Sequence, residues 1–372
     1  MARLNIGCDA RALVGPRTGV GTWTERVTGG LVRRGVATVR LAATGSVALE
    51  DHERHPALEI VPPPHRPTLG PIWLNSTVPR LARDLDVWLG SLAILPLRCP
   101  CPAVAVVHDL TPRTHPHRHT IGNRLVYRFL LAPSLRSAHA VVAVSRATAG
   151  ALREAYPWVD DRLEVIGNGV DEFFSPAPDG ADGRDVRRRF ASGRPFILHL
   201  GTVEPRKGLP DLVAAWEELR QKHPDGPDLV IAGRLGWQTG PILDRIRSSR
   251  LTDRIHLTGY VSRSDARELL RHAAVVVLAS EAEGFGLPLA EAISCGTTAV
   301  ASDIPALREV GGDAALYAPP HEPGALAAAL ATALEPSTAD RLRERALRRA
   351  PSLRWEPVIE AWTELVRRVA GE

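Results

Sequence analysis

Two hydrophobic patterns alternate along most of the chain. Short apolar runs, such as residues 103–107 (Ala-Val-Ala-Val-Val) and residues 141–144 (Val-Val-Ala-Val), are typical of strands that are covered on both faces. Between such runs, apolar residues recur with helical spacing, as in residues 22–34, where Trp23 and Leu31 fall on one face. Regular alternation of strands and helices predicts an α/β fold with parallel sheets.

The predicted elements cover both halves of the chain. The predicted strands are residues 3–9, 36–42, 58–61, 87–89, 103–107, 141–144, 196–200, 229–232, 255–257, 275–278 and 298–301. The predicted helices are residues 22–34, 74–85, 209–222, 242–248, 263–272, 287–294 and 323–334, and Ser145 is predicted to cap one more.

A change of residue composition near residue 170 predicts a domain boundary. Residues 168–183 are rich in Gly, Pro, Asp and Asn, which is typical of a linker. We therefore expect two doubly wound, Rossmann-like domains, residues 1–170 and residues 171–350. Residues 351–372 contain an amphipathic stretch with two tryptophans on one face, and we expect them to form a helix that packs back on the first domain.

Composition narrows the class of protein. The 372 residues are 44% hydrophobic and 24% charged, with a net charge of +4, so a large core can be buried and the basic excess is weak as a signal for nucleic acid. No secretory leader and no membrane-spanning run is recognised, and the four cysteines are expected to be free thiols. The sequence therefore predicts a cytoplasmic protein without nucleic-acid partners, at most peripheral on a membrane.

Candidate chemistry is sought in the loops that follow strands, because ligands of doubly wound sheets bind beyond the carboxyl ends of the strands. In the first half, Gly19 and Gly21 precede a helix and could offer amides to an anion, although a plain tight turn explains them equally well. His108 ends the strand at residues 103–107, where it could bond a ligand or carry a proton, with Asp109 beside it. A structural histidine is the alternative.

In the second half, Arg206 and Lys207 stand where a helix begins. Two adjacent cations with helix-end amides suit a diphosphate, and their unfavourable placement at the positive end of the helix dipole would be offset by a bound anion. A solvated basic turn is the alternative. A fainter signal is the loop at residues 259–262, whose backbone could read a base edge.

The stretch Glu-Gly-Phe-Gly-Leu-Pro-Leu-Ala-Glu-Ala at residues 283–292 carries two acids eight positions apart. The glycines free the backbone before a helix that Pro288 opens. Glu291, one turn inside the helix, could accept hydrogen bonds from ribose hydroxyls, and Glu283 could face a second polyol. The alternative is a pair of surface glutamates.

The Glu283–Glu291 pair resembles the Glu-x7-Glu signature of the family 4 retaining glycosyltransferases, which have the GT-B fold. Further stretches resemble that family in the expected order, and the resemblance covers nearly the whole chain. These stretches are residues 19–21, 108–109, 167–171, 201–208, 259–261, 284–292 and 295–296.

The resemblance implies a nucleotide sugar held in a cleft between the domains. Arg206 and Lys207 would bind the diphosphate, Glu291 the ribose and Glu283 the donor sugar, while His108 would bond the sugar near its anomeric carbon. Amides and loop positions would complete the donor pocket: Gly19, Gly21, Gly201, Val261, Phe285, Gly286 and Leu287.

The resemblance also implies a reaction that retains anomeric configuration without a metal ion or other cofactor. Cations would replace the metal, and the Asp84-Leu-Asp86 sequence is not expected to bind one. GDP-mannose is the favoured donor and a UDP-hexose the second choice. The acceptor is expected to be a glycan or lipid-linked. The basic, apolar residues 123–131 are open to two readings, a membrane-surface segment or a core helix with solvated arginines.

Two other functions stay open at this point. One is a sugar-nucleotide epimerase of the same two-domain plan, against which the paired cations and the Glu-x7-Glu spacing argue. The other is a non-catalytic protein that binds nucleotide sugars.

Overall fold

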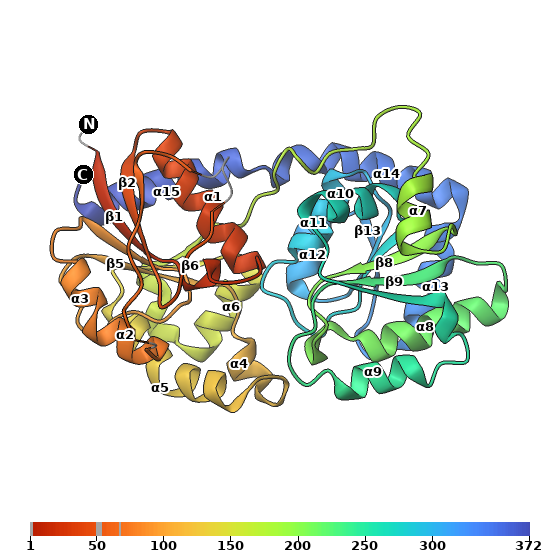
Figure 1. Cartoon of the computed structure of the whole chain (residues 1–372), viewed down its shortest axis with the longest axis horizontal. Coiled ribbons are helices and arrows are strands. Elements are labelled where there is room, and N and C mark those ends of the chain that lie inside the picture. The colour runs from red at the N-terminus through yellow and green to blue at the C-terminus, as the bar shows by residue number, and fades with distance from the viewer. Residues whose placement is uncertain (1–2, 50–53, 67) are drawn as a thin grey trace. The chain divides into compact units, whose positions relative to one another are not determined.

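A computed structural model describes residues 3–49, 54–66 and 68–372 of the chain. It divides into two compact units, each built on one parallel sheet (Figure 1). The N-terminal unit comprises Met1–Asn168 and Trp355–Glu372, and the C-terminal unit comprises Gly169–Arg354. The C-terminal segment of the chain is therefore part of the N-terminal unit.

The N-terminal unit contains a seven-stranded sheet in the order β3-β2-β1-β4-β5-β6-β7. All of its pairs are parallel, and four of its strands are buried along nearly their whole length. The strands are β1 (Leu4–Asp9), β2 (Ala37–Ala42), β3 (Leu58–Ile60), β4 (Val87–Gly90), β5 (Ala103–Val107), β6 (Ala140–Ala143) and β7 (Leu163–Val165).

Helices cover both faces of this sheet. They are α1 (Gly19–Arg33), α2 (Gly70–Ser76), α3 (Val78–Leu81), α4 (Thr111–Thr114), α5 (Ile121–Ser137), α6 (Arg146–Ala155) and, from the end of the chain, α15 (Trp355–Ala370). The Ser145 side chain accepts a hydrogen bond from the Thr148 amide at 3.0 Å, which confirms the predicted cap of α6.

The C-terminal unit contains a six-stranded parallel sheet in the order β10-β9-β8-β11-β12-β13. The strands are β8 (Phe196–Leu200), β9 (Asp228–Ala232), β10 (Ile255–Gly259), β11 (Val275–Leu278), β12 (Ala299–Ser302) and β13 (Ala315–Ala318). The helices are α7 (Arg184–Phe190), α8 (Leu209–Lys222), α9 (Gly240–Arg247), α10 (Arg263–His272), α11 (Leu287–Ser294), α12 (Pro305–Gly311), α13 (Pro323–Leu334) and α14 (Pro336–Arg349).

The prediction of one helix over residues 74–85 is wrong. Helix α2 starts earlier and ends at Ser76, and a separate turn, α3, follows Thr77. Pro79 is the physical reason, because its ring lacks an amide hydrogen and blocks the carbonyl one turn before it. The short elements α7, α12 and β13 were not predicted because their apolar stripes are brief, and the longer helix α14 was not predicted because arginines interrupt its apolar stripe.

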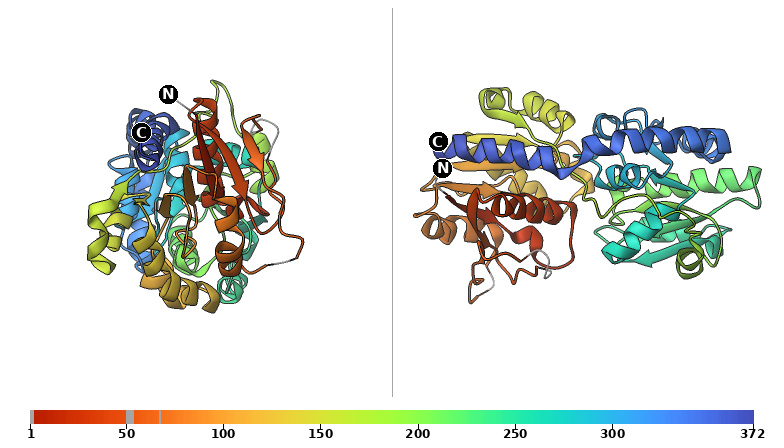
Figure 2. Two further views of the ribbon diagram at one scale, coloured as in Figure 1. Left: turned by 90° about the vertical axis from the view of Figure 1, so that its left-hand side faces the viewer. Right: turned by 90° about the horizontal axis from the view of Figure 1, so that it is seen from above.

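Helix α15 lies along the N-terminal unit, beside α1 and close to β4 (Figures 1 and 2). Its predicted apolar face is buried, with Trp362 and Val366 fully enclosed and Ile359 at 6% exposure. Gly30 of α1 lets the two helices approach closely, because a Cβ atom there would lie 2.7 Å from Ile359 Cδ1. Helix α15, near the end of the sequence, therefore packs tightly against α1, near its beginning.

Candidate functional site

The carboxyl edge of the C-terminal sheet carries the strongest candidate site. Strand order reverses between β8 and β11, which are neighbours although three α-helices and two strands lie between them in the chain. In open α/β sheets such a switch point is where ligands bind. Arg206 and Lys207 follow β8, and Glu283 follows β11, so the fold brings both loops to this one place.

A compact ion-pair cluster joins the two loops. Lys207 Nζ donates to Glu283 Oε1 at 2.5 Å, and Arg206 Nη1 donates to Glu283 Oε2 at 2.9 Å. Ser280 Oγ donates to the same Oε1 at 2.8 Å. The three charged side chains are only 8–17% exposed, so these are partly desolvated, charge-assisted bonds.

The environment fixes the charge of Glu283. Burial alone would raise the pKa of this carboxyl, but the charges of Lys207 and Arg206, with hydrogen bonds from Lys207 and Ser280, lower it to about 2. Glu283 is therefore ionised throughout the physiological range. An ammonium has three donors, so one bond to Glu283 leaves Lys207 able to meet a ligand oxygen as well.

Arg206 is held by two carboxylates, those of Glu283 and Glu204. Its Nε lies 2.5 Å from Glu204 Oε1, and its Nη1 also donates to the Ala282 carbonyl at 3.1 Å. The Glu281 amide donates to the Arg206 carbonyl at 2.8 Å. The guanidinium is therefore oriented before any ligand arrives.

Two glycines set the backbone around this cluster. Gly208 has φ of 61°, and a Cβ atom there would lie 2.0 Å from the Ala279 carbonyl oxygen, so no side chain fits between the loop and β11. Gly286 has φ of 99° and precedes α11, whose first residue is Leu287. Phe285, Gly286 and Leu287 thus form the N-terminal entrance of α11, where helix amides favour anions.

Glu291 lies in a different electrostatic setting from Glu283. It sits one turn inside α11, and burial raises its pKa to about 8, against the lowering effect of Arg263. Arg263 itself pairs with Asp171 at 3.0 Å, and that carboxylate pushes the pKa of Glu291 up further. At neutral pH Glu291 is largely protonated, so it can donate a hydrogen bond as well as accept one.

The remaining predicted donor positions of this unit lie on the same edge. Gly201 directly follows β8, and its amide donates to the Ala232 carbonyl at 2.9 Å. Val261 follows β10, the second neighbour of β8 in the sheet, and is partly buried against the core of the unit. Their roles toward a donor stay predictions.

The N-terminal unit presents its own candidate groups after β1 and β5. Gly19 begins α1, but the Gly21 amide already donates to the Thr18 hydroxyl at 3.3 Å, as part of the helix cap. A Cβ atom at Gly21 would lie 2.7 Å from the Ala12 carbonyl oxygen, so close loop packing explains that glycine. The predicted anion contact rests more on Gly19 than on Gly21.

His108 lies directly after β5 and is neutral at physiological pH. Burial lowers its pKa to about 4, against the charge of Asp109 and a hydrogen bond to the Ser91 backbone. Its Nε2 is buried and has no hydrogen-bond partner among the residues that the structure describes. The nitrogen that bonds Ser91 is therefore Nδ1.

Sequence reasoning missed three residues of the cluster's surroundings: Glu204, Ser280 and His199. His199 lies in β8 and is 1% exposed, and its pKa is lowered to about 4 by burial and by the charge of Lys207. Its Nδ1 lies 3.3 Å from the Val277 carbonyl oxygen. A histidine inside the apolar run Phe-Ile-Leu-His-Leu was the available signal.

Asp84 and Asp86 precede β4, at the amino end of the sheet rather than at its carboxyl edge. Asp84 accepts a bond from Arg40 at 2.8 Å, and Asp86 accepts one from the Asn5 amide at 2.7 Å. Within the described ranges, no three His, Cys, Asp or Glu side chains gather as they would around a metal ion.

Lysine is nearly absent from this chain. Of its 46 basic residues only Lys207 and Lys222 are lysines, and the others are arginines. Lys222 is exposed on the last turn of α8. A compact ammonium at the switch point is therefore the exception in a chain that otherwise uses the bulkier guanidinium.

Solved structures share this architecture over almost the whole chain. HepE of Anabaena, in complex with UDP and glucose, matches with a TM-score of 0.81 and 20% identity, covering 98% of this chain and 99% of that one. Sucrose-phosphate synthase of Thermosynechococcus elongatus matches with a TM-score of 0.78 and 20% identity, covering 99% of both chains. These likenesses establish the GT-B fold.

Two family models account for most of the sequence. Residues 17–174 match the model described as Glycosyltransferase Family 4, and residues 184–350 match the model described as Glycosyl transferases group 1. The sequence is 29% identical to the O-antigen chain mannosyltransferase B of Escherichia coli over 262 residues, 68% of this chain and 67% of that protein. It is 32% identical to a glycogen synthase of Mycobacterium tuberculosis over 207 residues, 55% of this chain and 48% of that protein.

Fold and sequence together define a GT-B glycosyltransferase. The chain belongs to glycosyltransferase family 4, and it is a hexosyltransferase.

The two lysines provide a matched test of the cluster. We expect Lys207→Ala to lower turnover by about 10²–10³-fold, because it removes a positioned cation that stabilises developing charge. Lys207→Arg should fail to restore activity, because a planar guanidinium needs more room than this enclosed position gives. Release of nucleotide from the sugar donor measures both, and Lys222→Ala should behave as the wild type.

The depressed pKa of Glu283 predicts how stability depends on pH. A carboxylate whose folded-state pKa is lowered stabilises the fold above its unfolded pKa, and this contribution is lost as pH falls toward about 2. Glu283→Gln should cost roughly 3–5 kcal/mol at pH 7, since it takes the paired carboxylate away from the buried Lys207 and leaves Arg206 with Glu204 as its remaining carboxylate partner. The difference from wild type, measured by chemical denaturation, should shrink below about pH 4.5.

The control for that measurement is Glu218→Gln, which removes an exposed helical pair with Lys222. That substitution should change stability by at most about 0.5 kcal/mol. A pH-independent deficit in Glu283→Gln would contradict the charge assignment.

Proposed function

We propose that the protein transfers mannose from GDP-mannose to a glycan or lipid-linked acceptor in the synthesis of cell-surface polysaccharide or glycolipid. The observation that carries the proposal is the Lys207–Arg206–Glu283 cluster at the switch point, which offers two oriented cations to a diphosphate. Relatives named as mannosyltransferases favour mannose. One is a GDP-mannose-dependent phosphatidylinositol monomannoside mannosyltransferase of Mycolicibacterium smegmatis, 29% identical over 311 residues, 77% of both proteins.

In this proposal the C-terminal unit holds the nucleotide. Lys207 and Arg206 bind the diphosphate and stabilise the negative charge that develops on the leaving group. Glu291 bonds the ribose, and the entrance of α11 adds amides from Phe285, Gly286 and Leu287. Gly201 and Val261 line the part of the pocket that holds the base and the phosphates of the nucleotide.

Glu283 is assigned two tasks, orienting the cations and contacting the sugar hydroxyls. His108 of the N-terminal unit is assigned to the donor sugar and Gly19 to its phosphates. The acceptor oxygen attacks the anomeric carbon from the face that the nucleotide leaves. The bond from that carbon to the phosphate oxygen breaks, and this oxygen takes the acceptor's proton. No separate carboxylate base, metal ion or other cofactor is assigned a step.

Thermal unfolding with nucleotides tests the donor. GDP and GDP-mannose should raise the melting temperature more than UDP and UDP-glucose at equal concentration, because ligand that binds the folded state stabilises it by mass action, by about 2.7 kcal/mol at one hundred times the dissociation constant. A larger rise in melting temperature with the uridine compounds would indicate a UDP-hexose as the donor instead of GDP-mannose.

Activity assays separate the rival functions. Transfer of labelled mannose to membrane or glycan acceptors in excess chelator is the expected result. Epimerised sugar nucleotide formed without acceptor would identify an epimerase. Binding of nucleotide with no release from any donor would identify a non-catalytic binding protein, and loss of transfer in chelator would overturn the metal-free scheme.

An exposed apolar stripe on α5 suggests where a lipid-linked acceptor could be met. Ile121, Leu125 and Phe129 follow at intervals of four, on one side of the helix, with exposures of 72%, 49% and 61%. The second half of α5 is core, since Leu131 and Leu135 are fully buried. In the first half, Val126 and Tyr127 also pack against the core, so the helix has a core-packed side, and its exposed stripe supports the membrane-surface interpretation.

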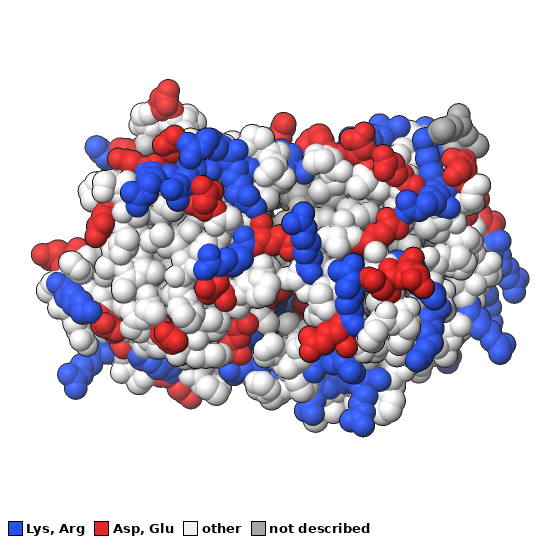
Figure 3. All heavy atoms as spheres, turned by 180° about the vertical axis from the view of Figure 1, so that it is seen from behind, with Lys and Arg blue, Asp and Glu red and all other residues white. Residues whose placement is uncertain are grey.

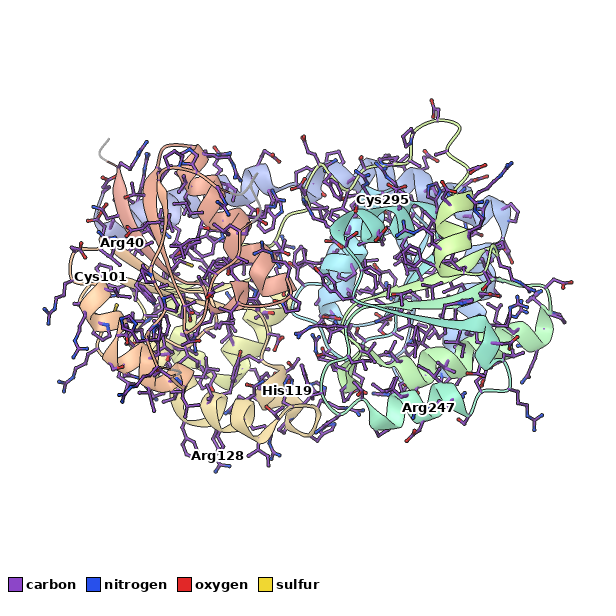
Figure 4. All side chains as sticks on the ribbon, viewed as in Figure 1. Arg40, Cys101, His119, Arg128, Arg247 and Cys295 are labelled. Carbon is purple, nitrogen blue, oxygen red and sulfur yellow. The ribbon has the colours of Figure 1, made fainter. Side chains whose placement is uncertain are left out.

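The same region is strongly basic. Residues 110–153 contain no Asp or Glu. Their arginines are Arg113, Arg118, Arg124, Arg128, Arg136, Arg146 and Arg153. Figure 4 shows Arg128 on the outer side of α5, and Figure 3 shows Lys and Arg gathered at the lower edge of the N-terminal unit, in the region of α4 and α5. Apolar side chains flanked by cations suit the interface of an anionic membrane.

We therefore include in the proposal a peripheral contact of α5 with the inner, cytoplasmic face of the membrane. Among the described residues, none of the helices has the length and apolar character needed to cross a bilayer.

Vesicle flotation tests this contact. The protein should float with vesicles that contain anionic phosphatidylglycerol, and not with pure phosphatidylcholine, and the binding should weaken as salt rises. Phe129→Ser should reduce binding about tenfold, in line with the apolar area that it removes. Leu257→Ser, a comparably exposed leucine of β10, is the control. Equal flotation of both variants would contradict the assignment to α5.

A further inference from the structure

Three rings in the N-terminal unit stand in contact one after another. The rings of Trp23 and His108 meet edge to face, with centroids 5.4 Å apart and planes at 81°. The rings of Trp23 and Trp362 meet in the same way, at 5.2 Å and 70°. Both tryptophans are fully buried. The three rings, called here the aromatic column, connect α15 through α1 to the end of β5.

The outer member of the column is fixed by a whole helix. Trp362 shares the buried face of α15 with Ile359, which fills the space that Gly30 leaves on α1. Arg34, at the end of α1, donates to the Glu356 carbonyl at 3.2 Å. Because α15 is held along its length, Trp362 cannot shift without loosening these contacts.

The inner member of the column is held on its other side by the backbone. The His108 ring bonds the backbone of Ser91 through Nδ1, and the Thr148 hydroxyl donates to the His108 carbonyl at 3.4 Å. In a neutral imidazole whose Nδ1 carries the hydrogen, Nε2 is an acceptor. The Trp23 ring packs nearly perpendicular to the imidazole, so it restricts rotation of the imidazole and covers one side of it.

We propose that Trp362 is a positioning residue, which acts through Trp23 to hold the His108 imidazole in one orientation and one tautomer, with Nε2 ready to accept a hydrogen bond from a hydroxyl of the donor sugar. The sugar contact rests on the proposed function. The positioning itself is a property of the free protein. The last helix of the chain would then contribute to catalysis through two rings, without touching the substrate.

Substitution of Trp362 tests the positioning. Trp362→Leu keeps an apolar side chain but removes the ring, so the His108 imidazole should gain freedom and water. By NMR of the imidazole nitrogens in the free protein, the pKa of His108 should rise from about 4 by at least about one unit toward its ordinary value. The charged side chain that acts on this ring is Asp109, which is unchanged in the variant.

Kinetics supply the second measurement. We expect Trp362→Leu to lower kcat about tenfold or more, with a smaller change in the KM for the donor, because the nucleotide is held in the other unit. Trp362→Phe restores an aromatic edge and should recover much of the loss; it also keeps the test informative if the leucine variant folds poorly.

Trp73→Leu is the control, since Trp73 is equally buried in the N-terminal unit but contacts Arg11 rather than His108. It should lose stability and leave the His108 titration and kcat per folded molecule unchanged. A wild-type His108 titration in Trp362→Leu, or equal effects in Trp73→Leu, would overturn the proposal. A shifted titration in a protein that shows no sugar transfer would refute the proposed function alone.

Discussion

The carboxylate of Glu283 is the group on which the ion-pair cluster of the C-terminal unit depends. It accepts bonds from Lys207 and Arg206, which are 76 and 77 positions away along the chain. Without the Glu283 carboxylate, the charges of Lys207 and Arg206 would repel each other in a partly buried site. Without the two cations, the buried carboxylate would have no charged partner. The loops after β8 and β11 therefore hold one another in shape.

The two glutamates of the Glu-x7-Glu spacing are not equivalent. Glu283 keeps a permanent charge because two cations compensate it, whereas Glu291 is buried with weaker compensation and holds its proton at neutral pH. One acid thus serves as an electrostatic anchor and the other as a hydrogen-bonding group that can act in either direction. The motif combines two kinds of chemistry on one loop and one helix.

The sequence predicted the fold well where elements are buried or long. The strands β5, β8 and β11 and the helices α8, α10, α11 and α13 match their predicted bounds, because continuous apolar runs and clear apolar stripes leave few alternatives. The break at Pro79 and the short helices α7 and α12 were missed, since few residues determine them.

Of the site, the sequence identified the loops and their charged residues but not their pairing. Contact between Lys207 and Glu283 depends on β8 and β11 being neighbours, which local patterns do not reveal. For the same reason local patterns did not reveal that His199 lies within the electrostatic influence of Lys207, or that Trp23 touches His108. The protonation states of Glu283, Glu291 and His108 could not be predicted from the sequence either, because they depend on burial and on neighbouring charges in the folded protein.

The scarcity of lysine has a practical consequence. Reagents that modify lysine amines, and proteases that cleave after lysine, find two such side chains in the whole sequence, one on the surface and one within the ion-pair cluster. Attachment through a lysine side chain would therefore fix the protein to a support chiefly by the end of α8. The second amine would react only when its partners let go of it, so its labelling rate would report directly on how often the empty cluster opens.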